Sequence, residues 1–216
     1  MLLQLALDTL PREKARDLVQ RLYREVDIVE VGTPMLLRYG LEVVSEIKNL
    51  VGEKPIFADA KIVDAGRYET EMVLSSGADM VSVLGGASFL TLKEAKEVCE
   101  QKGAKLVVDT IDLEAPSPQR VEALWAIRPD YLVLHLPSDL AREGQSFEEA
   151  MRDSPFLQKP FSFMVAGGLR RESLPGVLRV VWPHIVVVGS AVTASPWPER
   201  EVQLLQEVLH GFCRES

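Results

Sequence analysis

The sequence predicts a (β/α)8 barrel, also called a TIM barrel, from two observations. Short apolar segments with the composition of buried strands end at intervals of 22 to 31 residues along the chain. Between them lie segments with the amphipathic periodicity of helices. Eight alternating strand–helix units are typical of this fold, which usually has slightly more than the 216 residues found here.

Each expected strand is short and is followed by one expected helix. The expected strands are 3–7, 27–29, 55–58, 80–83, 106–108, 131–134, 162–165 and 185–188. The expected helices are 12–24, 35–50, 67–76, 90–101, 118–126, 147–151, 174–180 and 198–210. The rival architecture is a doubly wound open sheet. It normally has fewer strands and a Gly-rich turn after the first, whereas residues 8–11 read Asp-Thr-Leu-Pro.

The composition is that of one globular domain over residues 1–216. Hydrophobic residues make up 47% of the chain and charged residues 26%, and no low-complexity segment marks a linker. The net charge of −8 argues against nucleic acid as a partner, because phosphate backbones are bound by basic surfaces. No apolar run has the length of a membrane span, so we expect no membrane partner either.

The start of the chain and its cysteines predict a cytoplasmic protein. Residues 1–8 read as the first strand, since they lack the basic region and the cleavage site of a secretory signal. Cys99 falls in the expected helix 90–101, Cys213 follows the expected helix 198–210, and both lie outside any metal-ligand spacing. Such usage is typical of a reducing compartment rather than of a disulfide framework.

The pattern Asp59-x-Lys61-x-x-Asp64 follows the third expected strand and concentrates three charges in six residues. On an extended chain Asp59 and Lys61 point to the same side, because side chains alternate with period two. A lysine among carboxylates stays protonated and can act as an electrostatic clamp, while a free carboxylate edge suits a hard cation. Taken alone, the pattern is more often that of a surface salt-bridge cluster.

Polar side chains also stand at the carboxyl ends of other strands, and this favours a functional site. The residues are Asp8, Glu30, Asp59, Asp109 and His135. In a barrel they share one rim, where the active sites of this fold are built. Singly, His135 fits a core position as well, and Asp8 and Asp109 fit helix caps.

Small residues follow the seventh and eighth strands, at Gly167-Gly168 and at Gly189-Ser190. Glycine lets backbone N–H groups approach a ligand closely, and barrels often bind phosphate after these two strands. A single Gly-Gly pair is more often a plain turn. Two such turns at these positions of an eightfold repeat indicate a phosphate site.

Four segments together resemble the 3-hexulose-6-phosphate synthase family, within the orotidine 5'-monophosphate decarboxylase superfamily. They are LALD at 5–8, EVGTP at 30–34, DAKIVDAG at 59–66 and VGSAVT at 188–193. The similarity covers residues 3 to about 195. The Asp-Ala-Gly at 64–66 is unlike the Asp-Ile-Pro of the orotidylate decarboxylases. It is similar to the metal-dependent branch, which also contains 3-keto-L-gulonate-6-phosphate decarboxylase.

The resemblance implies a Mg²⁺-dependent reaction of ribulose 5-phosphate and formaldehyde through a 1,2-enediolate, in a homodimer with shared active sites. By this resemblance, Glu30 and Asp59 bind Mg²⁺, His135 transfers the proton at C1, and Lys61 assists at the adjacent oxygen. Asp8 and Asp109 bind substrate, and Asp64 reaches into the active site of the neighbouring subunit. The implied phosphate-binding residues are Gly167, Gly168, Gly189 and Ser190.

The sequence departs from the family pattern after the sixth strand. Hexulose-phosphate synthases read His-Thr-Gly-x-Asp-x-Gln-Ala there, whereas residues 135–142 read His-Leu-Pro-Ser-Asp-Leu-Ala-Arg. The gulonate decarboxylases carry arginine where this chain has Ser138 and Ser190, which counts against decarboxylation. Three interpretations stay open: an aldol-type lyase, a sugar-acid phosphate decarboxylase, and a barrel that binds a phosphorylated metabolite without turning it over.

Overall fold

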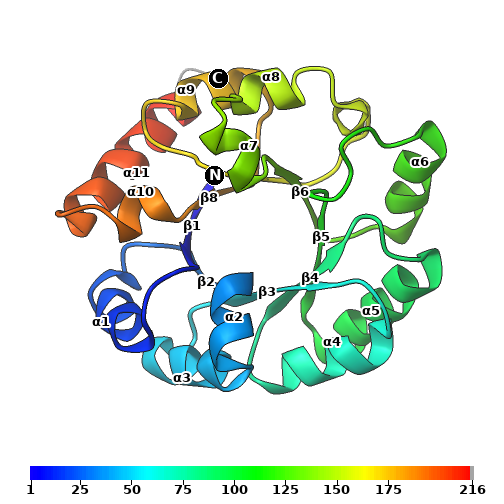
Figure 1. The fold of residues 1–216 in the computed structure, drawn as a ribbon, viewed down its shortest axis with the longest axis horizontal. Coiled ribbons are helices and arrows are strands. Elements are labelled where there is room, and N and C mark those ends of the chain that lie inside the picture. The colour runs from blue at the N-terminus through cyan, green and yellow to red at the C-terminus, as the bar shows by residue number, and fades with distance from the viewer. Residues whose placement is uncertain (215–216) are drawn as a thin grey trace.

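Eight parallel strands close into a barrel in the computed structural model of the chain, which describes residues 1–214. Each strand pairs with its neighbours in sequence, and β8 pairs back with β1. The helices surround this ring on the outside (Figure 1). The barrel confirms the predicted fold class and excludes the doubly wound sheet. The last two residues of the predicted domain, 215 and 216, lie outside the described residues.

The order of elements follows the predicted alternation. The strands are β1 Leu2–Leu7, β2 Ile28–Val31, β3 Ile56–Ile62, β4 Met80–Leu84, β5 Lys105–Asp109, β6 Tyr131–His135, β7 Phe163–Ala166 and β8 Ile185–Val188. The helices are α1 Arg12–Leu22, α2 Thr33–Tyr39, α3 Glu42–Val51, α4 Gly66–Ser75, α5 Phe89–Lys102, α6 Pro118–Ile127, α7 Ser138–Arg142, α8 Phe147–Met151, η1 Pro155–Gln158, α9 Leu174–Val180, α10 Ser190–Thr193 and α11 Pro198–Arg214.

Two predictions about these elements were wrong. The single helix expected at 35–50 is two helices, because Gly40 has a φ of 68° and ends α2 before α3 begins. The third strand was expected to end at Ala58, but β3 continues to Ile62 and so contains the charged motif. The short helices α7, α10 and η1 were not predicted.

Side chains on the two faces of the barrel form two separate cores. The larger core lies between the strands and the helices, where residues such as Leu5, Val81 and Leu205 are fully buried. The smaller core fills the barrel itself with residues such as Phe57 and Met164. No helix within the described residues is both long and apolar enough to cross a membrane.

Aspartates in three loops hold the amino-terminal rim of the barrel together. Each precedes an even-numbered strand and accepts a hydrogen bond from the backbone N–H of the strand before it. The pairs are Asp27 with Leu3 at 2.8 Å, Asp79 with Ile56 at 2.8 Å and Asp130 with Leu106 at 3.0 Å. These carboxylates therefore satisfy N–H groups at the rim opposite the predicted site.

The hydrogen bonds that Asp79 accepts give a prediction about stability. Asp79 Oδ2 accepts from the N–H of the buried Ile56 and from Lys48 Nζ, both at 2.8 Å. Asp79→Ala leaves that N–H without its acceptor and is expected to lower the free energy of unfolding by about 1–3 kcal/mol. Urea denaturation measures this change in the free energy of unfolding, and the m-value should stay unchanged. The control is Asp17→Ala, which removes an exposed pair with Arg21 and should change the free energy by under about 0.5 kcal/mol.

Candidate active site

The predicted polar residues gather around the carboxyl-terminal rim of the barrel. Asp109 and His135 close β5 and β6, as their positions in sequence predict. Glu30 lies inside β2, one residue before its end, and Asp59 lies inside β3. All four face the barrel axis rather than the helices, since they alternate along their strands with residues of the outer core.

Lys61 is held between two carboxylates that come from different strands. Its Nζ lies 2.9 Å from Asp59 Oδ2 and 2.5 Å from Asp109 Oδ2. Burial of the ammonium opposes its charged form, but the attraction of Asp109 and Asp59 outweighs burial and raises the pKa of Lys61. The side chain is therefore a fixed cation at neutral pH, as the motif predicts.

Asp109 connects this cation to His135. His135 Nδ1 lies 3.0 Å from Asp109 Oδ2 and 3.1 Å from Oδ1, and the backbone N–H of Ile111 donates to Oδ1 at 2.9 Å. Burial disfavours the carboxylate, yet His135 and Lys61 outweigh it and lower the pKa of Asp109. When Nδ1 donates to this carboxylate, the other ring nitrogen, Nε2, is left as the proton acceptor.

A second group of carboxylates carries an excess of negative charge. Burial of Glu30, reinforced by repulsion from Asp59 and Asp8, raises its pKa well above the usual value. The pKa of Asp8 is raised too, by burial first and then by Asp59. Among the described residues, Oε2 of Glu30 accepts from Gln4 Nε2 at 2.6 Å and Oε1 has no donor. These charges favour a cation beside Glu30 and Asp59.

The side chain of Asp8 fits between two glycines that follow other strands. A Cβ atom on Gly32, just after β2, would collide with Asp8 Oδ1, and one on Gly189 would lie 3.1 Å from Asp8 Oδ2. Glycine at position 32 is therefore what allows Asp8 to lie beside Glu30. Asp8 and Asp109 are not helix caps, because Pro11 and Ser117 precede α1 and α6.

Asp64 is the predicted catalytic residue that the structure does not bring into this site. It lies beyond β3 in an exposed loop, two residues before α4, and it makes no hydrogen bond or ion pair within residues 1–214. The two carboxylates beside the lysine are those of Asp59 and Asp109. A role for Asp64 within its own chain therefore has no support in this geometry.

The two glycine turns lie where they were expected. Gly167 follows β7 with a φ of 106°, and a Cβ atom there would collide with the Leu136 carbonyl oxygen. Gly189 precedes α10, which begins at Ser190. Helix α7 packs over the first turn, since a Cβ on Gly168 would lie 3.4 Å from that of Ala141. Phosphate binding by these turns stays a prediction.

Three residues around the site were missed from the sequence. Gln4 binds Glu30, the Thr33 hydroxyl lies 2.9 Å from Asp59 Oδ2, and Ser82 donates to Asp59 Oδ1 at 2.8 Å. Gln4 and Ser82 share one signal that would have found them. Each is a lone polar residue in the middle of an otherwise apolar strand, at a position that faces the barrel interior.

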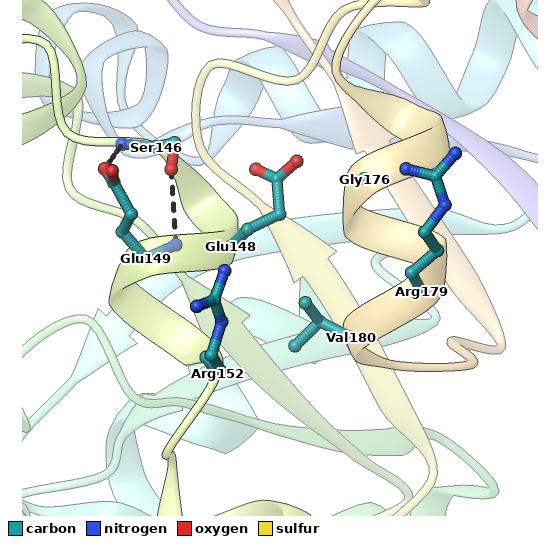
Figure 2. Close-up of a pocket in the computed structure, with 7 residues that line it drawn as sticks. All are labelled: Ser146, Glu148, Glu149, Arg152, Gly176, Arg179 and Val180. Carbon is teal, nitrogen blue, oxygen red and sulfur yellow. Dashed lines mark hydrogen bonds between the residues drawn. The ribbon is translucent and has the colours of Figure 1, made fainter.

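A pocket of about 630 Å³ lies elsewhere, between α8 and α9. Figure 2 shows that it is lined by charged side chains, among them Glu148 of α8, Arg152 just after it, and Arg179 of α9. Ser146 and Glu149 at its edge cap α8 through reciprocal hydrogen bonds. It contains none of the predicted site residues, so we place the active site at the barrel rim.

Comparisons with known proteins identify the family of the chain. The sequence profile described as "Orotidine 5'-phosphate decarboxylase / HUMPS family" matches residues 1–205. A 3-hexulose-6-phosphate synthase of Bacillus subtilis is 34% identical over 212 residues, which cover 98% of this chain and 100% of that protein. The structure of the same enzyme from Salmonella typhimurium superposes with a TM-score of 0.91 at 33% identity, covering 98% of this chain and 99% of that one.

A more distant structure shares the fold. It is described as 3-keto-L-gulonate-6-phosphate decarboxylase from Vibrio cholerae, and it superposes with a TM-score of 0.84 at 20% identity. The alignment covers 98% of both chains. At this identity the likeness extends to the barrel architecture alone.

Proposed function

Because the chain belongs to the orotidine 5'-phosphate decarboxylase / HUMPS family, we propose that it is an aldol-type lyase that joins formaldehyde to ribulose 5-phosphate. One observation carries this proposal: Asp109 binds both the ammonium of Lys61 and the ring of His135. The carboxylate thereby places a fixed cation and a proton acceptor side by side at the rim. The full-length relatives named 3-hexulose-6-phosphate synthase support it as well.

The reaction needs a proton moved and a negative charge stabilised. His135 Nε2 removes a proton from C1 of ribulose 5-phosphate, and the electrons of that C–H bond give a 1,2-enediolate. Carbon C1 then forms a bond to formaldehyde, whose oxygen takes the proton from His135. Lys61 donates to an oxygen of the enediolate, where its charge lowers the energy of the transition state.

The residues present fit a divalent cation. Glu30 and Asp59 would hold Mg²⁺, because both are carboxylates on neighbouring strands that face the barrel interior, and one oxygen of Glu30 has no donor among the described residues. No group of three ligating side chains occurs in the described part of the chain. Two protein carboxylates suit Mg²⁺, because this ion usually keeps several waters or substrate oxygens as its other ligands. When bound, the ion supplies Lewis-acid stabilisation of negative charge on the substrate.

The test is a turnover assay on the purified full chain. With ribulose 5-phosphate, Mg²⁺ and ¹³C-labelled formaldehyde, NMR should show a new carbon–carbon bond to the label. A parallel sample with a 3-keto sugar-acid phosphate tests for release of carbon dioxide. Carbon dioxide release without formaldehyde uptake would make the protein a decarboxylase, and binding without either reaction would make it a non-catalytic barrel.

We also propose that two copies of the chain form a dimer through the apolar face around α4. Large hydrophobic side chains there stand exposed: Val63 by 56%, Tyr68 by 70% and Met72 by 46%. Phe89 and Leu90, which begin the neighbouring helix α5, are exposed by 48% and 62%. Clustered exposed apolar residues mark an interaction surface. Asp64 lies in the same loop as Val63, so a two-fold contact here would carry it toward the partner's site.

A mixture of two inactive variants tests the shared site. Asp64→Asn and Lys61→Ala chains, unfolded together and refolded, should recover up to about a quarter of wild-type activity. Half of the dimers would be mixed, and half of their sites would have both native residues. Sedimentation confirms that each variant is dimeric. If dimeric mixtures stay as inactive as either variant alone, Asp64 does not act across the interface.

A further inference from the structure

The β3 strand is irregular where it carries the lysine, and Ser82 of β4 lies opposite this irregularity. Ala58 pairs with Val81, and the next pair along the two strands is Ile62 with Val83. Four residue steps along β3 therefore correspond to two steps along β4. Ser82 alone faces the three residues of β3 between these pairs. Because the insertion is of two residues, the alternation of side chains is preserved on both sides of it.

Lys61 adopts a strained backbone conformation within this irregular segment. Its φ is 49°, in the left-handed region that residues other than glycine rarely occupy. Such strain persists only where surrounding contacts enforce it, and it concentrates at functional sites. The conformation also decides in which direction the lysine side chain leaves the strand.

The hydroxyl of Ser82 makes the contacts that hold this conformation. The backbone N–H of Lys61 donates to Ser82 Oγ at 2.8 Å, and the Ser82 hydroxyl donates to Asp59 Oδ1 at 2.8 Å. Ser82 has no exposed surface, so water cannot replace either bond. The Ser82 hydroxyl thus accepts a hydrogen bond from the backbone of Lys61 and donates one to Asp59, the carboxylate that the Lys61 ammonium also binds.

We propose that Ser82 is a positioning residue, which fixes the backbone of Lys61 and the carboxylate of Asp59 relative to each other. Its hydroxyl replaces the strand carbonyl that would accept from Lys61 in a regular ladder. Ser82 acts through Lys61 and Asp59, the two residues that its hydroxyl binds. Its effect on catalysis rests on the proposed function, whereas its effect on the conformation of Lys61 does not.

Three variants test the kinetic effect. Ser82→Ala removes the hydroxyl and is expected to lower kcat about tenfold to a hundredfold with little change in KM, because the bound substrate then meets a misplaced ammonium. Ser82→Thr keeps a hydroxyl and should retain most of the activity. Ser45→Ala is the matched control: it removes a serine bond of 2.8 Å to the Ser76 carbonyl on an outer helix, and it should leave kcat unchanged.

Crystal structures of the wild type and of Ser82→Ala give a readout that needs no activity. We expect Lys61 to leave the left-handed region in the variant and its Nζ to move away from Asp59. Wild-type kcat in Ser82→Ala, or an unchanged Lys61 backbone, would overturn the positioning role. If the wild type turns over neither substrate class, the proposed function fails, and the structures still decide the role of Ser82. If Ser82→Ala does not fold, Ser82→Cys takes its place in both measurements.

Discussion

Glu30→Gln and Asp59→Asn are each expected to lower kcat at least about a hundredfold, and chelation of divalent cations should abolish turnover. Both substitutions keep the shape of the side chain while removing a negative charge beside the substrate. Stopped assays with and without added Mg²⁺ measure the effect. The matched control is Glu46→Gln, a carboxylate paired with Arg12 on the outer surface, which should retain activity.

The charge of the carboxylate group adds a readout that does not depend on turnover. Folding raises the pKa of the Glu30 carboxyl group. This group therefore stabilises the folded state below its pKa in the unfolded chain, and the stabilisation is lost as the pH rises through its pKa in the folded state. Mg²⁺ and protons compete for the carboxylate of Glu30. The Tm is therefore expected to rise with added Mg²⁺, and to rise more at pH 8 than at pH 5, where the proton concentration is higher. Glu30→Gln should lose this response. Full activity in excess chelator would contradict the metal site.

Much of the fold could be predicted because the barrel repeats one local pattern eight times. A strand buried on both faces is a short apolar run, and its end is marked by the first polar residue that reaches the rim. Asp109 and His135 were placed correctly for this reason. Glu30 and Asp59 were expected just beyond strands that in fact continue past them, because the sequence does not distinguish a polar residue inside a barrel strand from one that follows the strand.

The contacts between strands could not be predicted in the same way. Lys61 binds Asp109, which is 48 residues away in sequence, and nothing local distinguishes Asp109 from Asp64 as its second partner. That choice depends on the register of β3 against β4 and β5. The register in turn depends on the insertion opposite Ser82, which has no signal in the alternation of apolar residues.

The helix behind the motif shows a similar limit. Met72, Val73 and Leu74 form an apolar run in α4 that fits either packing on their own barrel or a subunit contact. The structure divides them, since Val73 and Leu74 are buried against the barrel and Met72 is exposed by 46%. Three consecutive apolar residues cannot share one face of a helix, so the run itself did not decide between the two alternatives.

Lys61→Ala is expected to reduce kcat by about a hundredfold or more while raising KM much less, because the ammonium acts mainly on charge that develops in the transition state. Removal of the cation also leaves the carboxylates of Asp59 and Asp109 without the ammonium between them, so the variant should be less stable at neutral pH than at low pH. Added ethylamine, which can fill the vacated space with a small ammonium, should restore part of kcat. The matched control is Lys93→Ala, which removes an exposed lysine on α5 and should leave kcat unchanged.

The alternative role for Lys61 is a Schiff base with the ketose carbonyl, and the geometry opposes it. A Schiff base requires the neutral amine, whereas Asp109 and Asp59 raise the pKa of Lys61 and keep the side chain protonated at the pH of the reaction. Borohydride added during turnover with ribulose 5-phosphate should therefore leave no mass adduct on the chain. A reduced adduct mapped to Lys61 by peptide mass spectrometry would replace electrostatic stabilisation with covalent catalysis, and the predicted rescue by ethylamine would then have no basis.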